Sequence, residues 1–217
     1  MFIGHYAAAF GAKALAPRAP LWTLVGAAQL LDVAFSGFLI AGLERFRVDP
    51  SLPGNQLVLE HMPWSHSLPA AVLWSVLAAA LARMIVPWRV AAIIGGVVFS
   101  HWILDWITHR PDLGLWFDGP KVGLGFWNLP VAEMAFEMSL LTLAAGAWIA
   151  RRKEGHQSAW PALLFLTMLC GLAVLYALPA QEPDNAVYAG VMGLVLFGVV
   201  TALAWPIDRS WRAPDAH

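Results

Sequence analysis

The feature that most constrains this chain is a series of six long apolar runs. They lie at about residues 21–43, 68–86, 89–108, 128–150, 160–179 and 186–205. Each run is close to the roughly 20 residues that an α-helix needs to cross the hydrocarbon core of a bilayer. A water-soluble domain carries about 25% charged residues, whereas this chain carries 12%. We therefore predict an all-α integral membrane protein in which residues 1–217 form a single transmembrane domain.

A shorter, Ala-rich segment at residues 2–16 precedes these runs, and Pro17 and Pro20 separate it from the first of them. Its basic residues, Lys13 and Arg18, follow the apolar stretch, whereas a signal peptide carries its basic residues before that stretch. We therefore expect this segment to remain in the protein as a short inserted helix beside six long transmembrane helices.

The basic residues predict how the helices are oriented. If the six runs alternate sides, nine of the 13 Lys and Arg residues fall on one side, namely Lys13, Arg18, Arg83, Arg89, Arg151, Arg152, Lys153, Arg209 and Arg212. Because cytoplasmic loops are enriched in Lys and Arg, we expect this side and the C terminus to be cytoplasmic. The irregular loops at 44–67 and 109–127 would then face outward. The predicted location is the bacterial inner (plasma) membrane, crossed several times.

The composition also limits the possible partners. The net charge of −1 argues against nucleic-acid binding, which requires a basic surface. Cys170 is the single cysteine, so neither a disulfide nor a cysteine metal site is expected. The runs at 160–179 and 186–205 contain no charged residue. We therefore expect membrane lipids as partners, and residues 160–205 as scaffold helices or as a homo-oligomer contact.

Residues 100–110, SHWILDWITHR, put ionisable side chains into an apolar run. His101 and Asp105 are four residues apart and share one face of the predicted helix, which Thr108 and His109 extend. Ionisable groups within a membrane-spanning helix are costly and usually face the interior of the bundle. One interpretation is a neutralised His–Asp pair that fixes the packing, and the other is a functional site.

The depth of the ionisable residues favours a shared site. At 1.5 Å per residue, His5, Asp32, His101 and Glu137 each lie about 18–20 Å from the cytoplasmic ends of their segments. His66 stands at the outer start of its helix, within reach of the same layer. Five segments therefore deliver His, Asp or Glu to one level. We predict a polar pocket in the outer half of the membrane.

The types of these side chains indicate a metal site. The stretch HMPWSHSL adds two histidines, with Ser65 or Ser67 as the expected N-cap of the next helix. The candidate metal ligands are His5, Asp32, His61, His66, His101 and Asp105. Imidazole and carboxylate are ligands of zinc and related metals. Six ligands are more than one tetrahedral ion binds. We therefore expect either two ions, or one ion with Asp residues that orient its His ligands.

Four sequence elements carry a resemblance to a known family: GH at Gly4–His5, LLD at Asp32, HMPWSHS at 61–67 and HWILDWIT at 101–108. They resemble motifs of the membrane-bound metal-dependent hydrolases, also described as LexA-regulated inner-membrane hydrolases, a family linked by motif to zinc-dependent phospholipase C. The resemblance covers roughly residues 1–110 and implies metal-binding elements there, with a phospholipid-like substrate. In the LLD element, Ala34 and Phe35 replace an Asp and a His of the family pattern, which leaves His109 or Glu137 as a compensating ligand.

Taken together, these features predict a membrane-embedded hydrolase that uses metal-activated water, with zinc as the expected ion, on an ester or phosphoester. Glu137 and Asp105 are the candidate proton carriers. Arg110, Lys121 and His109 are the candidate contacts to a lipid headgroup. Two alternatives remain open: an ion- or proton-coupled transporter, and a metal-stapled structural membrane protein without turnover.

Overall fold

The computed structural model describes residues 3–176 and 185–208. In this part of the chain the helices are α1 (His5–Leu15), α2 (Leu21–Ala28), α3 (Leu30–Ile40), α4 (Leu68–Ala82), α5 (Trp88–Thr108), α6 (Pro130–Glu154), α7 (Trp160–Tyr176) and α8 (Ala186–Ile207). The predicted helical bundle is confirmed. The final residues of the predicted 160–179 run and the C-terminal tail beyond Asp208 lie outside the described residues.

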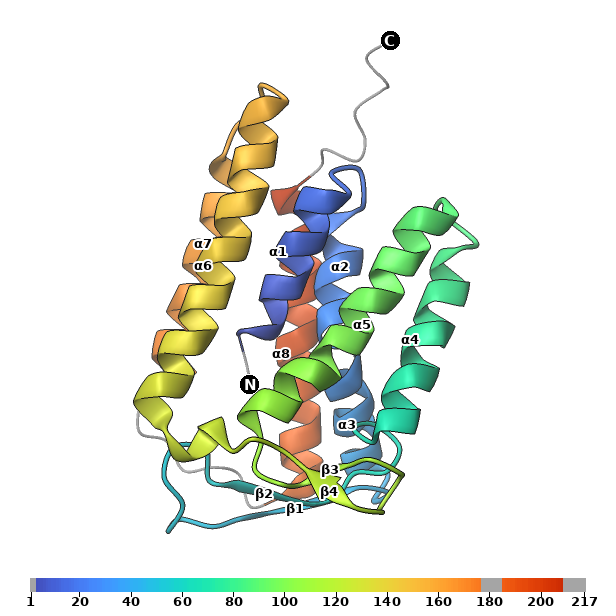
Figure 1. The fold of residues 1–217 in the computed structure, drawn as a ribbon, viewed down its shortest axis with the longest axis vertical. Coiled ribbons are helices and arrows are strands. Elements are labelled where there is room, and N and C mark those ends of the chain that lie inside the picture. Colours follow the sequence, from blue (N-terminus) through green and yellow to red (C-terminus); the bar gives the residue numbers. More distant parts are fainter. Residues whose placement is uncertain (1–2, 177–184, 209–217) are drawn as a thin grey trace.

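The two long loops contain short antiparallel hairpins. Strand β1 (Arg45–Val48) pairs with β2 (Leu57–His61), and β3 (Leu113–Gly114) pairs with β4 (Lys121–Val122). A 3-10 turn, η1 (Phe126–Asn128), leads into α6. Both hairpins lie at one end of the bundle, where α5 ends and α4 begins (Figure 1). The loops at 44–67 and 109–127 therefore cover the same end, as their pattern predicted.

The described residues do not support the predicted count of six long transmembrane helices. Among the described residues, α5, α6 and α8 are long and apolar enough to cross a membrane, and α2 with α3 forms a fourth candidate that is bent by 54°. Helices α4 and α7 are shorter apolar helices. The apolar run of α4 continues to Val86, but the helix ends at Ala82. Proline disfavours helical geometry in the residue before it, and Val86 precedes Pro87.

The bend between α2 and α3 occurs at Gln29, which is buried and has non-helical backbone angles (φ −112°, ψ 10°). Irregular backbone within a membrane is tolerated where protein groups satisfy its hydrogen bonds. Here the carbonyl of Ala28 lies 2.8 Å from Nδ1 of His101 on α5. The bend thus brings a backbone acceptor to α5, and α3 begins after it at Leu30, two residues before Asp32.

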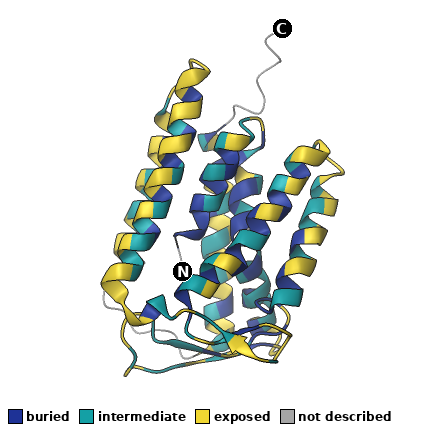
Figure 2. Cartoon of the chain, in the orientation of Figure 1, coloured by how far each residue is buried: buried dark blue, intermediate teal, exposed yellow. Residues whose placement is uncertain are grey.

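Helix α1 is the short inserted helix and lies in the middle of the bundle. It begins part-way along the bundle and runs to the end opposite the hairpins (Figure 1). It packs against α6, α2 and α5, and burial is concentrated on it and on the facing sides of its neighbours, whereas the outer helices are exposed (Figure 2). Its sequence HYAAAFGAKAL is rich in Ala and Gly. Small residues let helix backbones approach closely, which explains how a helix is accommodated there.

The end of α1 away from the hairpins is held by buried ion pairs. Lys13 Nζ lies 2.6 Å from Asp208 Oδ2 and donates to the carbonyls of Pro17 and Ala19. Arg152 Nη1 lies 3.3 Å from the other carboxylate oxygen of Asp208. These three residues are at most 9% exposed. The cluster joins the ends of α1, α6 and α8, and so fixes the position of α1 within the bundle.

Candidate metal centre

Four segments bring ionisable side chains together in the half of the bundle nearer the hairpins. His5 is the first residue of α1, Asp32 lies in the first turn of α3, His66 directly precedes the N-cap of α4, and His101 and Asp105 lie on α5. The three histidines and Asp105 are at most 2% exposed, and the side chain of Asp32 is 22% exposed. The predicted convergence of these five residues is therefore found in the structure.

One group of contacts surrounds a point between α3, α4 and α5. Asp32 Oδ1 lies 3.4 Å from His66 Nε2 and 3.6 Å from His101 Nε2. Asp105 Oδ2 lies 3.5 Å from His66 Nε2 and 3.1 Å from His101 Nε2. Around a tetrahedral zinc ion with bonds of about 2.1 Å, neighbouring donor atoms lie about 3.4 Å apart. The four carboxylate-to-imidazole distances are therefore close to the spacing of neighbouring ligands around one ion.

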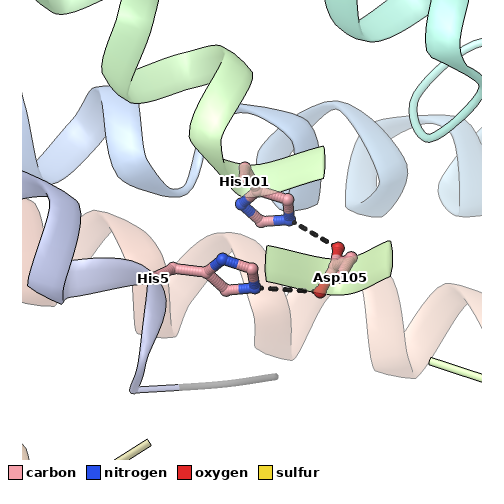
Figure 3. A group of neighbouring side chains, drawn as sticks. All are labelled: His5, His101 and Asp105. Atoms are coloured by element: carbon pink, nitrogen blue, oxygen red, sulfur yellow. Dashed lines mark ion pairs between the residues drawn. The ribbon is translucent and has the colours of Figure 1, made fainter. Parts of the chain in front are cut away.

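A second group of contacts lies on the other side of Asp105. Its Oδ1 lies 3.1 Å from His5 Nε2 and 3.2 Å from His109 Nε2. Figure 3 shows His5 and His101 side by side, each with one ring nitrogen directed at a different oxygen of Asp105. Their rings are stacked, with centroids 3.6 Å apart and planes inclined by 1°. The carboxylate of Asp105 thus has His5 and His109 on one oxygen, and His66 and His101 on the other.

The protonation of His101 follows from its surroundings. Its Nδ1 lies 2.8 Å from the Ala28 carbonyl, and because a carbonyl oxygen can only accept, Nδ1 carries the hydrogen. Its Nε2 then points at Asp32 and Asp105, yet this buried nitrogen makes no hydrogen bond within the described residues. So close to two carboxylates, this nitrogen is stabilised by positive charge, either on a protonated ring or on a bound cation. A metal ion bound through Nε2, with Nδ1–H held by a carbonyl, fits this arrangement.

His5 lacks such an acceptor. Both of its ring nitrogens are buried, and neither makes a hydrogen bond with the described residues, although Nε2 is close to Asp105. Its stacked ring lies next to the ring of His101, so two neighbouring imidazoles offer nitrogens to one carboxylate. His5, His101 and Asp105 form one group of possible metal ligands within 4.8 Å of one another, and Asp32, His66 and His101 form another.

His109, at the C-cap of α5, has a carboxylate at each ring nitrogen. Nε2 lies 3.2 Å from Asp105 Oδ1 and Nδ1 lies 3.0 Å from Asp112 Oδ1. Burial lowers the pKa of His109, but the charges of Asp105 and Asp112 outweigh it, so the pKa is raised above its ordinary value. Its ring also contacts Trp127, with centroids 3.9 Å apart. Both carboxylates therefore favour the protonated form of His109.

Glu137 lies at the beginning of α1, beside the cluster. It is 3% exposed, and its Oε2 accepts a hydrogen bond of 2.9 Å from the backbone N–H of Gly4. An acidic side chain at a helix N terminus is stabilised by the partial positive charge there. Glu137 thus holds the residue that directly precedes His5.

Three residues that the sequence singled out lie elsewhere. His61 Nδ1 pairs with Asp118 Oδ2 at 2.5 Å rather than with the buried cluster. The guanidinium of Arg110 donates to the carbonyls of two residues in the 44–67 loop and to Asn128 Oδ1. Lys121 Nζ donates to the carbonyl of Glu60. The contacts of His61, Arg110 and Lys121 therefore join the two outer loops to each other.

The structure also identifies polar groups that the sequence did not single out. Glu44, which is 1% exposed, accepts hydrogen bonds from the backbone N–H groups of Trp64 and Ser65 and from the Ser65 hydroxyl. Ser67, not Ser65, is the N-cap of α4. No sequence signal distinguishes Glu44 from any other loop carboxylate, because its partners are mainly backbone groups 20 residues away.

The comparisons with known proteins identify one family. Its model, described as YdjM inner membrane protein, matches residues 1–181. The match covers the helices and loops that form the cluster, from His5 through Glu137. No curated protein and no solved structure matches the chain.

Proposed function

We propose a function from the premise that this chain belongs to the YdjM inner membrane protein family: it is a metal-dependent hydrolase of the inner membrane that cleaves an ester or phosphoester. The observation that carries the proposal is the buried Nε2 of His101. It lies within 3.6 Å of two carboxylates and makes no hydrogen bond among the described residues. Such an arrangement is expected of ligands arranged around a cation.

Asp32, His66, His101 and Asp105 would hold one divalent ion, with zinc as the first candidate because two imidazoles and two carboxylates suit it. His5 and the second oxygen of Asp105 offer a further position. When bound, such an ion supplies Lewis-acid activation of water near neutral pH. Asp32 is the most exposed of these ligands, so we expect substrate and water to arrive on its side.

Glu137 would move protons between the reacting groups and solvent, with Asp105 as the second candidate. Glu137 is nearly buried and adjoins the residue before His5. When protonated, His109 would supply positive charge beside Asp105 and stabilise the developing charge of the substrate. Arg110 and Lys121 would contribute by holding the two outer loops together. Of the three candidate contacts to a lipid headgroup, His109 is therefore the main one that remains.

The site would face the extracytoplasmic side, with the C terminus in the cytoplasm, because most basic residues lie at the opposite ends of the helices. A site within the membrane-spanning bundle favours a lipid-like substrate, and a phospholipid is the substrate class that we propose. The exposed apolar surfaces of α7 and α8 would contact lipids or a second copy of the chain.

The proposal is tested by metal analysis of purified protein. Wild type is expected to hold a stoichiometric divalent ion, and His101→Ala and His66→Ala are expected to lose it while remaining folded. His156→Ala, which changes an exposed histidine after α6, is the matched control and should keep the ion. Wild type that binds no ion, or variants that bind as much as wild type, would contradict the proposal.

A second measurement separates an enzyme from a metal-stapled structural protein. Wild type is reconstituted into vesicles of phosphatidylethanolamine and phosphatidylglycerol, and release of headgroup or fatty acid is measured. Glu137→Gln is expected to keep the ion and to lose cleavage. A metal-loaded wild type that cleaves neither the phosphoester nor the carboxylic ester bonds of these lipids would argue for the structural alternative.

A further inference from the structure

We propose that Glu44 is a positioning residue that fixes the tautomer of His66 through the hydroxyl of Ser65. The inference rests on the proposed function, because it concerns how His66 presents a nitrogen to the ion. Glu44 follows α3 in sequence and is separated from Ser65 by the first hairpin. It is 1% exposed, and Ser65 is fully buried.

The end of α3 determines where Glu44 lies. Gly42 has a φ of +70°, a conformation that glycine adopts without the steric cost of a Cβ and that commonly ends helices. The N–H groups of Leu43 and Glu44 then both donate to the carbonyl of Phe38. This turn directs the chain back beneath the beginning of α4. Glu44 therefore meets the segment that contains His66.

The carboxylate of Glu44 is surrounded by donors. Its Oε1 accepts the backbone N–H groups of Trp64 and Ser65, both at 2.8 Å. Its Oε2 accepts the Ser65 hydroxyl at 2.6 Å. The same hydroxyl oxygen lies 2.7 Å from Nδ1 of His66. A continuous chain of hydrogen bonds thus runs from Glu44 through Ser65 to His66.

The direction of this chain follows from the chemistry of its members. A serine hydroxyl carries one hydrogen, and here that hydrogen is donated to Glu44. The hydroxyl oxygen can then only accept from His66, so Nδ1 of His66 carries the hydrogen. In the neutral ring Nε2 is left with its lone pair, and this nitrogen lies 3.4 Å from Asp32 and 3.5 Å from Asp105. Glu44 thus prepares His66 as a ligand, as the Ala28 carbonyl does for His101.

The hydrogen bond from His101 to the Ala28 carbonyl and the chain from His66 through Ser65 to Glu44 differ in one respect: only the second can reverse its direction. A backbone carbonyl accepts in every variant, whereas Glu44→Gln puts an amide in place of the carboxylate. With the amide oxygen on the two backbone N–H groups, its NH₂ faces Ser65 and donates to the hydroxyl. The hydroxyl hydrogen, which no longer has the carboxylate as its acceptor, can then be donated to Nδ1 of His66, and this reversal shifts the ring hydrogen to Nε2. The variant therefore blocks the ligand nitrogen and leaves the side-chain shape nearly unchanged.

The test compares Glu44→Gln with Ser65→Ala and with the double variant. Groups that orient metal ligands typically change metal affinity by about 10–100-fold, and we expect a loss in this range for Glu44→Gln, measured by zinc competition with a chelator. Ser65→Ala leaves Nδ1 without a partner but forces no tautomer, so its loss should be smaller. In the Ser65→Ala background, Glu44→Gln has no hydroxyl to reverse and should have little further effect.

Two controls separate the tautomer from charge and from folding. Glu60→Gln removes the charge of an exposed carboxylate of the same hairpin and should leave zinc affinity unchanged. A purely electrostatic role of Glu44 would persist in the Ser65→Ala background, so equal losses in both backgrounds would overturn the inference. A Glu44→Gln affinity equal to that of wild type would also overturn it.

The tautomer itself is measured by ¹⁵N NMR of metal-free wild type with labelled histidine, assigned with His66→Ala. A hydrogen on Nδ1 of His66 is expected, and a neutral ring with its hydrogen on Nε2 would refute the role of Glu44. This measurement decides the inference even if Glu44→Gln does not fold. If wild type binds no metal ion, the proposed function fails, and the tautomer measurement still tests the hydrogen-bond chain by itself.

Discussion

Replacing Asp105 by Asn distinguishes two explanations of the buried cluster, an ion-binding site and a set of His–Asp ion pairs. Asp105 is 1% exposed, and each of its oxygens lies 3.1 Å from a histidine nitrogen, one from His5 and one from His101. Asparagine keeps the size of the side chain and removes its charge. Its NH₂ group can donate to one imidazole lone pair, which a carboxylate cannot do.

The two explanations predict opposite changes in the stability of the metal-free protein. If the cluster binds an ion, removing the ion leaves buried carboxylates facing lone pairs. Replacing a buried charge in such surroundings should then stabilise the metal-free protein, by about 1–3 kcal/mol. Metal affinity should fall by more than the roughly 100-fold expected for an orienting group, which is about 2.7 kcal/mol. If protonated histidines pair with Asp105, the same substitution breaks buried pairs and costs about 3–5 kcal/mol.

The assay is denaturant unfolding in detergent micelles of chelator-treated wild type and Asp105→Asn, with metal content measured on untreated samples. Asp118→Asn is the matched control, because Asp118 pairs with His61 in the outer loops, where the Asp118 side chain is 49% exposed. Its effect should stay within about 0.5 kcal/mol. A metal-free Asp105→Asn variant that is several kcal/mol less stable than metal-free wild type would refute the ion-binding explanation.

Three further predictions concern residues around the cluster. Arg110→Ala should destabilise the outer loops by about 1.5–3 kcal/mol, because charged hydrogen bonds are lost, while the metal content stays unchanged; limited proteolysis of the 44–67 loop and metal analysis check this. Lys13→Met should cost about 3–5 kcal/mol in denaturant unfolding, since Asp208 loses one partner of a buried pair. Glu137→Gln should keep its bond from Gly4, because an amide oxygen also accepts, and should lower turnover by about 10²–10⁴-fold with the ion retained.

The sequence predicted the membrane-spanning bundle but not the number of long helices. Apolar runs indicate which residues avoid water. For α5, α6 and α8 they correspond to helices that are long and apolar enough to cross a membrane. They contain no signal for the bend at Gln29, which depends on a tertiary contact between Ala28 and His101. They also overestimate α4, because Met84, Ile85 and Val86 are apolar but lie beyond the end of the helix at Ala82. Helix ends and bends are set by local backbone chemistry and packing, which hydropathy does not include.

The convergence of the site residues was predictable because depth along a helix follows from counting residues. His5, Asp32, His66 and His101 lie in one layer for that reason, and the structure brings them together. Which side chains face one another depends on helix rotation and loop path, which a residue count does not give. His61 illustrates the limit, because the end of β2 directs it to Asp118. Glu44 illustrates it further, because its role depends on a turn and on backbone donors.

The charges of the cluster bear on how many ions it can hold. Asp32 and Asp105 supply two negative charges, which one divalent ion neutralises when His66 and His101 are neutral ligands. A second divalent ion near His5 would leave an excess of buried positive charge, and an uncompensated buried charge is costly. His109, whose pKa is raised by Asp105 and Asp112, would add to that excess when it is protonated. A second ion would therefore need an additional anion, and a phosphoester substrate is an anion of the kind that the proposed reaction provides.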